Sequence, residues 1–234
     1  MKRILTIIPA HNEAATVADV VREVRSLYPV DVLVVDDCSS DATAIKARQA
    51  GANVMTLPIQ LGAWGATQTG MRYARQRGYL GALTMDADGQ HHPSSLEPLL
   101  LAILHDETDV AIGSCVGRAT RLRRMAWSFF RRLGSLELDD LTSGLRAYSS
   151  SAIDTLIGRE ATLLDYQDVG VLVLLRRHKQ RVSEIPVSMS QRCNGKSRIF
   201  CSWSRVANYM FQTTILCTAK LGSYPKKHGS KTQG

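Results

Sequence analysis

Two aspartates one residue apart, Asp86 and Asp88, follow the apolar run 82–85. Side chains i and i+2 at an extended strand end face the same side, so both carboxylates can approach one hard cation. Mg²⁺ and Mn²⁺ prefer oxygen ligands and usually keep water or substrate phosphate in their shell. Gln90 continues the spacing with a neutral oxygen. These three residues form a candidate metal site, although a polar turn with Asp and Gly as turn formers explains them equally well.

Two further polar clusters also follow apolar runs. Residues 9–13 follow the first run, and Asp36 and Asp37 follow the second. A carboxylate at such a position can accept hydrogen bonds from a nucleobase or a ribose. We expect Asp41 to cap the helix after it. For Asp37, ligand binding and a local structural role are equally consistent with the sequence.

Three loops combine glycine with polar or basic residues. The loop 60–70 enters a helix whose N-terminus favours anions, but its spacing matches neither standard phosphate loop, and Gly70 is expected to serve tight packing. Asp140 and Arg146 flank another glycine turn. Segment 192–198 places three cations around a glycine. Such a segment suits a phosphate clamp, but a solvated basic loop is the more common case.

Apolar runs alternate with helical patterns over the first half of the chain. The expected strands are 4–8, 32–35, 53–57, 82–85 and 110–113, and the expected helices are 17–27, 42–50, 65–77 and 93–105. Such alternation predicts an α/β fold with a mainly parallel sheet and helices on both faces. The polar clusters then meet at the carboxyl edge of the sheet. The second half is less regular, with a helix expected at 166–179 and a strand at 184–188.

Charge is distributed unevenly along the 234 residues. Residues 1–116 hold nine basic and 13 acidic residues, a balance of −4, and residues 117–234 hold 20 and eight, a balance of +12. The basic half predicts an anionic partner such as phosphate or a membrane surface. Five cysteines without a CxxC pair indicate a reducing compartment. No run reaches the ~18 uncharged apolar residues of a membrane span.

Aromatic and basic residues are mixed in two stretches of the second half. Arginines flank the apolar run 125–130, and apolar residues recur at helical spacing over 203–217. Both patterns suit either the headgroup zone of an anionic membrane or packing against the sheet. We expect a main domain over 1–200, an amphipathic helical segment over 201–225 and a flexible basic tail over 226–234.

The order of these motifs resembles the inverting family-two glycosyltransferases of the GT-A fold. It is most similar to the branch that contains dolichyl-phosphate mannose synthase and bacterial polyprenyl-phosphate glycosyltransferases. The resemblance rests on the following motifs, in this order along the chain: Pro9-Ala10-His11-Asn12-Glu13, Val35-Asp36-Asp37-Cys38-Ser39-Ser40-Asp41-Ala42-Thr43, the loop around Gly62, Asp86-Ala87-Asp88-Gly89-Gln90-His91-His92-Pro93, Asp140-Leu141-Thr142-Ser143-Gly144-Leu145-Arg146, and Glu184-Ile185-Pro186-Val187 before Arg192 and Gly195-Lys196-Ser197. It extends over residues 3 to about 200.

The resemblance implies a role for each matching position. Pro9, Glu13 and Asp37 would hold the nucleoside, and Asp86, Asp88 and Gln90 would bind the divalent metal on the sugar diphosphate. Arg192, Lys196 and Ser197 would contact the phosphates, and Asp140 and Arg146 would line the acceptor side. Asp88 and Asp140 would be the catalytic residues. Gln60 departs from the usual Asn, and Gly113-Ser114-Cys115 departs from the usual Gly-Ser-Arg unless Arg118 replaces that arginine. These departures bear on the acceptor more than on the donor.

The resemblance favours an enzyme that uses Mg²⁺ or Mn²⁺ to move a sugar, with inversion, from a nucleotide sugar to a polyprenyl phosphate. We expect it on the cytoplasmic face of the cell membrane, bound peripherally to an anionic surface. A hydroxyl acceptor is the alternative, and it would need Asp140 as a general base. A non-catalytic protein that binds nucleotide sugar or nucleic acid is a further alternative, although the acidic half would repel a nucleic acid.

Overall fold

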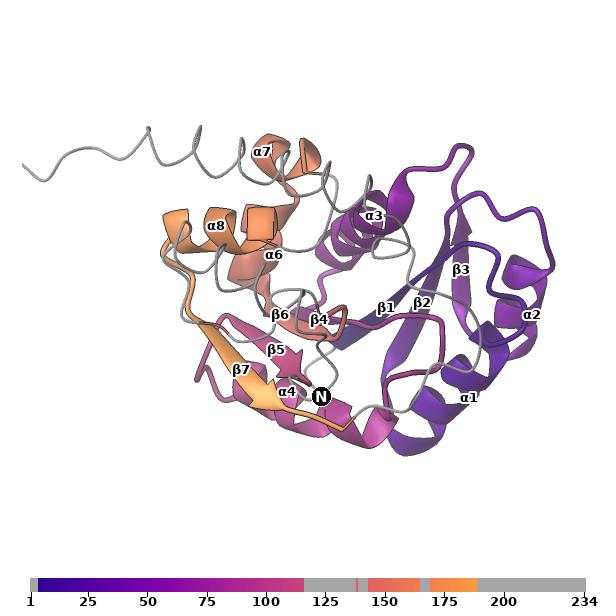
Figure 1. The fold of residues 1–234 in the computed structure, drawn as a ribbon, viewed down its shortest axis with the longest axis horizontal. Coiled ribbons are helices and arrows are strands. Elements are labelled where there is room, and N and C mark those ends of the chain that lie inside the picture. Colours follow the sequence, from indigo (N-terminus) through magenta and orange to yellow (C-terminus); the bar gives the residue numbers. More distant parts are fainter. Residues whose placement is uncertain (1–3, 116–137, 139–142, 165–168, 189–234) are drawn as a thin grey trace, which may run out of the picture. The chain divides into compact units, whose positions relative to one another are not determined.

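A computed structural model describes residues 4–115, 138, 143–164 and 169–188 (Figure 1). The chain divides into two units, 1–195 and 196–234, and every described residue belongs to the first. Its elements are β1 (Ile4–Ala10), α1 (Val17–Leu27), β2 (Asp31–Asp36), α2 (Thr43–Gln49), β3 (Asn53–Thr56), α3 (Gly62–Gln76), β4 (Gly81–Thr84), η1 (Pro93–Ser95), α4 (Leu96–Leu104), β5 (Val110–Ser114), β6 (Arg146–Ser149), α6 (Ser150–Leu156), α7 (Arg159–Thr162), α8 (Val169–Arg177) and β7 (Val182–Pro186).

The seven strands form one sheet in the order β3-β2-β1-β4-β6-β5-β7. Strands β1, β2, β3 and β4 pair in parallel, and so do β5 and β7. Strand β6 runs antiparallel to both of its neighbours, β4 and β5. The predicted fold class, α/β with a mixed and mainly parallel sheet, is confirmed. The alternation along the sequence did not reveal β6, because it is a four-residue strand that begins with an arginine.

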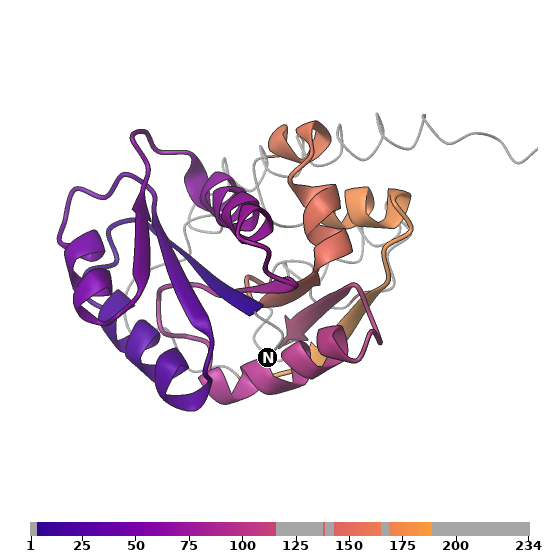
Figure 2. The same ribbon diagram turned by 180° about the vertical axis from the view of Figure 1, so that it is seen from behind.

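Helices cover both faces of the sheet, as the two opposite views show (Figures 1 and 2). On one face α1 packs through Val17, Val20, Val21 and Val24, all buried, in one apolar core with α2 and α4. The spacing of these four valines places them on one side of a helix, which is why α1 forms where the sequence predicted it. On the other face α3 packs against β1 and β2, and α6 packs against β4 and β6.

The predicted tight packing of Gly70 is confirmed. A Cβ atom added to this glycine would lie 2.5 Å from Cγ2 of Ile7, so only a residue without a side chain lets α3 approach β1 this closely. The resulting contact fixes the height of α3 above the sheet. It therefore also fixes where the first turn of α3 stands relative to the carboxyl ends of β1 and β2.

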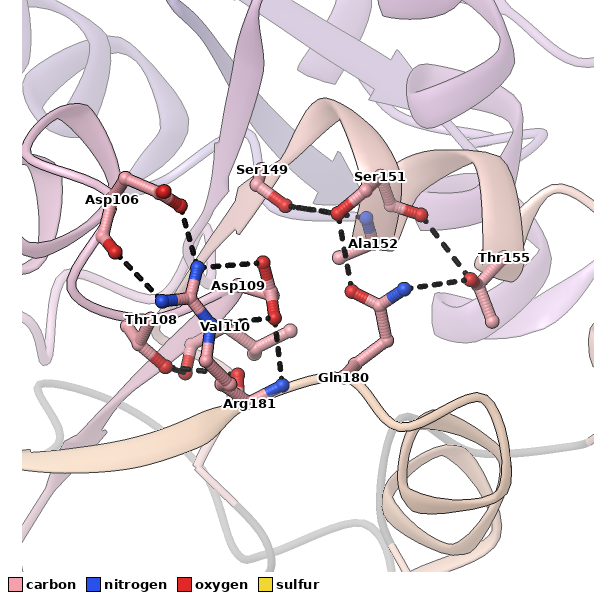
Figure 3. Close-up of polar contacts among 10 residues, drawn as sticks. All are labelled: Asp106, Thr108, Asp109, Val110, Ser149, Ser151, Ala152, Thr155, Gln180 and Arg181. Carbon is pink, nitrogen blue, oxygen red and sulfur yellow. Dashed lines mark hydrogen bonds and ion pairs between the residues drawn. The ribbon is translucent and has the colours of Figure 1, made fainter.

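A polar cluster lies beside β7, an edge strand of the sheet, and includes residues before β5 and residues of α6 (Figure 3). The guanidinium of Arg181, just before β7, donates to Asp109 Oδ2 at 3.1 Å and to the backbone oxygen of Asp106 at 2.8 Å. The hydrogen bond from Arg181 is the main reason that the pKa of Asp109 is lowered, against the opposing effect of burial. Gln180 extends the cluster to Ser151 and Thr155 of α6. These contacts join β7 to the loop before β5 and to α6.

Several sequence predictions lie outside the described residues. They are the domain boundary near 200, the helical segment 201–225, the tail 226–234 and the arginine-flanked run around 125–130. Within the part of the chain that the structure describes, none of the helices has the length and apolar character needed to cross a membrane.

Candidate active site

The loops after β1 and β2 lie at one edge of the sheet and are joined by hydrogen bonds. The backbone N–H of Asn12 donates to Ser39 Oγ at 2.9 Å, and the backbone N–H of Ser40 donates to Asn12 Oδ1 at 2.9 Å. The backbone N–H of Glu13 donates to Thr43 Oγ1 at 2.8 Å. Two predicted clusters, 9–13 and 36–41, are thus brought together as the parallel arrangement of their strands predicts.

Asp41 contacts the start of α2 from the position before the N-cap residue, which is Ala42 and not Asp41 as predicted. Its carboxylate accepts hydrogen bonds from the backbone N–H groups of Thr43 at 2.9 Å and Ala14 at 3.1 Å. Burial alone would raise the pKa of Asp41, but the hydrogen bonds from Thr43 and Ala14 outweigh it and lower that pKa. Asp41 therefore serves both the helix and the loop after β1.

Asp37 is buried and holds the start of α3. Its Oδ1 accepts from the backbone N–H of Leu61 at 2.6 Å, and its Oδ2 accepts from the backbone N–H of Gly62 at 2.9 Å. A helix N-terminus attracts negative charge because its first N–H groups lack partners within the helix. The sequence predicted anion binding at this helix start, and the anion that the structure places there is the carboxylate of Asp37. A carboxylate has about four acceptor positions, so these two bonds do not exclude a nucleoside contact.

Asp86 and Asp88 follow β4 at the same edge. Asp86 is exposed, Ala87 is buried and Asp88 is partly exposed, which is the alternation expected when residues i and i+2 share one side. Asp88 Oδ1 accepts from the backbone N–H of Gln90 at 3.1 Å, and Gly89 adopts a positive φ of 72°. The tight turn thus holds Asp88 in place while the side chain of Gln90 is largely buried.

The carboxylate of Asp86 lies close to two residues that were not among the predicted site residues. Nε2 of His91 is 3.4 Å from Asp86 Oδ2. A Cβ added to Gly144 would be 2.6 Å from each Asp86 oxygen. In the sequence, His91 and Gly144 are marked only by their places in the motifs 86–93 and 140–146. Their contact depends on β6 pairing with β4.

Three of the other predicted residues have contrasting surroundings. Pro9 is in β1, partly buried and in register with Val35 of β2. Glu13 is partly buried, and its backbone oxygen accepts the N–H of Val17 at 3.0 Å at the start of α1. Arg146 is fully buried in β6 and donates from Nε to the backbone oxygen of Ser143 at 2.9 Å. Arg146 therefore supports the turn that carries Gly144.

Asp140, Arg192, Lys196 and Ser197 lie outside the described residues. The acceptor base and the basic phosphate loop consequently remain predictions from the sequence.

The donor set at the end of β4 fits a hard divalent cation. Asp86 and Asp88 supply carboxylate oxygens at the exposed edge, and Mg²⁺ is usually bound by one or two carboxylates together with substrate phosphate and water. Among the described residues no three His, Cys, Asp or Glu side chains form a complete metal site. A cation here would thus be completed by oxygens from a ligand, which suits a phosphate-bearing substrate.

In the described part of the chain, three features define a GT-A glycosyltransferase fold: the seven-stranded sheet, the antiparallel strand β6 within it, and the aspartate pair after β4. A solved structure with the same fold is glucosyl-3-phosphoglycerate synthase from Mycobacterium tuberculosis, in complex with Mn²⁺, UDP and glucosyl-3-phosphoglycerate. It has a TM-score of 0.71 and 19% identity over 96% of this chain and 82% of that one.

The sequence comparison identifies the family. Residues 6–153 match the profile of glycosyl transferase family 2, and the chain belongs to that family. It is 32% identical to the undecaprenyl-phosphate mannosyltransferase of Micrococcus luteus, over 84% of this chain and 87% of that one. It is 28% identical to the polyprenol monophosphomannose synthase of Mycolicibacterium smegmatis, over 90% and 85%.

Proposed function

We propose that this glycosyltransferase moves a sugar from a nucleotide sugar to a polyprenyl phosphate, with inversion and with Mg²⁺ or Mn²⁺. The observation that carries the proposal is the likeness, over most of the chain, to relatives named for polyprenyl-phosphate mannosylation. The aspartate pair at the sheet edge supports it independently, because a nucleoside diphosphate supplies the oxygens that complete a two-carboxylate metal site.

The donor would lie along the carboxyl edge of β1, β2 and β4. Pro9, Glu13 and Asp37 would contact the nucleoside, and the hydrogen bonds between the two loops hold Glu13 in place. Asp86 and Asp88, with Gln90, would bind the metal on the diphosphate. A bound divalent cation offsets the charge that builds on a departing nucleoside diphosphate. Asp88 counts as catalytic in this proposal because it would contact that group.

The acceptor determines whether a base is needed. A phosphomonoester has a second pKa of about 6, so a polyprenyl phosphate is already largely ionised at neutral pH. Such a nucleophile needs cations that position it more than a group that takes its proton. Arg192, Lys196 and Ser197 are proposed for this positioning, while Asp140 would act as a base only for a hydroxyl acceptor.

A membrane surface would present the lipid acceptor. The 20 basic residues after residue 116, against eight acidic ones, favour peripheral binding to an anionic bilayer on its cytoplasmic face.

The test is product formation by purified protein. The reaction holds Mg²⁺ or Mn²⁺, one of a panel of nucleotide sugars, and either a polyprenyl phosphate or the matching polyprenol in detergent. Mass spectrometry should detect a glycosylated lipid phosphate with one donor, no product with the polyprenol, and at least 100-fold less product from Asp88→Ala, since a lost charge-stabilising group typically costs about 10²–10³ in rate.

Other outcomes have defined meanings. Product from the polyprenol, or from a saccharide with no lipid present, would refute the phosphate acceptor and favour the hydroxyl acceptor. Product that is undiminished in Asp88→Ala would refute the role given to the aspartate pair.

A further inference from the structure

We propose that His91 and Gly144 are positioning residues that fix the Asp86 carboxylate in the orientation that binds the metal. The inference rests on the proposed function in one respect, namely that Asp86 is a metal ligand. It goes beyond that function by assigning roles to a histidine and a glycine that lie next to this carboxylate.

His91 is a buried ring aimed at an exposed carboxylate. Its side chain is 1% exposed, whereas that of Asp86 is 50% exposed, and Nε2 lies 3.4 Å from Asp86 Oδ2. The contact with this buried ring favours the rotamers of Asp86 in which the carboxylate faces Nε2.

The tautomer of His91 follows from its surroundings. Among the described residues, the buried Nδ1 has no hydrogen-bond partner. A proton on Nδ1 would therefore be a buried N–H without an acceptor, and it would leave the Nε2 lone pair facing the carboxylate. Placing the proton on Nε2 makes His91 a donor to Asp86 and leaves only an acceptor atom unpaired, which costs less.

The unpaired Nδ1 also indicates why a histidine is present. A buried polar atom without a partner lowers stability, and an apolar ring of the same shape would avoid this cost. Retaining a histidine here is the pattern expected when a site gives up stability for function. In metal sites, groups that bond to the ligands orient them and tune their affinity in this way.

Gly144 also limits the positions that the Asp86 carboxylate can take. A Cβ at position 144 would lie 2.6 Å from both Asp86 oxygens, closer than atoms that are not bonded can approach. The backbone of Gly144 cannot easily withdraw, because Thr84 Oγ1 donates to its carbonyl oxygen at 2.9 Å. A side chain at position 144 would therefore displace the carboxylate of Asp86, which can swing into solvent.

These two contacts have a common consequence. The carboxylates of Asp86 and Asp88 repel each other, so without restraint the exposed one would turn away from its partner. The His91 ring and the glycine surface hold Asp86 in place before the cation arrives. Folding then orders the Asp86 carboxylate in advance, so metal binding does not bear the free-energy cost of ordering it and metal affinity rises.

The experiment measures Mn²⁺ binding directly, by the loss of the free Mn²⁺ signal in electron paramagnetic resonance, with UDP or GDP present. The variants are His91→Phe, His91→Gln and Gly144→Ala, and the matched control is His105→Phe, an exposed histidine at the end of α4. We expect His91→Phe and Gly144→Ala to bind Mn²⁺ about 10- to 100-fold more weakly. His91→Gln, which keeps a donor near the Nε2 position, should recover part of this loss, and the control should bind as the wild type does.

Thermal unfolding separates positioning from simple support of the fold. His91→Phe should melt at the same temperature as the wild type or higher, because it removes a buried nitrogen without a partner. His91→Phe could instead lose Mn²⁺ affinity and also melt at a lower temperature, with no recovery of affinity in His91→Gln. That result would overturn the assignment of His91. Unchanged affinity in His91→Phe and Gly144→Ala would overturn the inference while the metal site stands. Wild-type protein that binds no Mn²⁺ with either nucleotide would refute the metal site itself.

Discussion

Replacing Asp37 by asparagine tests whether its carboxylate holds the start of α3. The side chain is 3% exposed, and its two oxygens accept the N–H groups of Leu61 and Gly62 at 2.6 and 2.9 Å. An asparagine keeps one oxygen, but its NH₂ group then faces the other backbone N–H, so one hydrogen bond is replaced by two opposed donors.

The size of the effect follows from these contacts. A hydrogen bond to a charged group contributes about 1.5–3 kcal/mol. The Leu61 side chain is 47% exposed, so water can reach this loop and replace part of the lost bond. We therefore expect Asp37→Asn to lower the free energy of unfolding by about 2 kcal/mol, and the melting temperature by about 4–8 °C for a domain of this size.

Urea denaturation at pH 7 measures the change, with Asp19→Asn as the control. Asp19 is 78% exposed in its side chain and pairs only with Arg22 of the same helix among the contacts described, so its replacement should cost less than about 1 kcal/mol. Equal midpoints for the two variants would refute the anchoring role of Asp37. Well below both transitions, a raised donor KM in Asp37→Asn would report the proposed nucleoside contact separately.

Three further predictions concern the far edge of the sheet, the α3 packing and the metal. Asp109 has a lowered pKa in the folded protein, so its contribution is fully present above its usual value near 3.8 and is lost as the pH falls through the folded value. Asp109→Asn should thus lower the free energy of unfolding by about 1 kcal/mol at pH 7, and a deficit that stayed constant down to pH 2 in urea titrations would contradict this. Gly70→Ala would force a Cβ against Ile7 and should cost about 1–3 kcal/mol; a midpoint in urea equal to that of the wild type would show that α3 can shift freely. EDTA should abolish sugar transfer and Mg²⁺ or Mn²⁺ should restore it, whereas transfer that persists in EDTA would exclude the proposed metal.

The sequence by itself determined the repeating part of the fold. Apolar runs alternating with helical patterns predicted β1 to β5 and the helices between them, because a strand buried on both faces and a helix buried on one have different periods. Parallel strands put their carboxyl ends at one edge, so the positions of Asp37 and Asp86 at a common edge followed without any knowledge of contacts. The contact of Asp41 with the start of α2 was also predictable to within one residue, because it joins residues next to each other in the chain.

The tertiary structure alone decided which residues meet across long stretches of sequence. Strand β6 enters the sheet between β4 and β5, and this pairing places Gly144 against Asp86 and buries Arg146. Asp37 accepts hydrogen bonds from Leu61 and Gly62 at the start of α3, and Gly70 allows that helix to approach β1 closely. Such contacts depend on pairing and packing between distant segments, whose energies are not encoded in local periodicity, and the surroundings of Asp86 are a result of them.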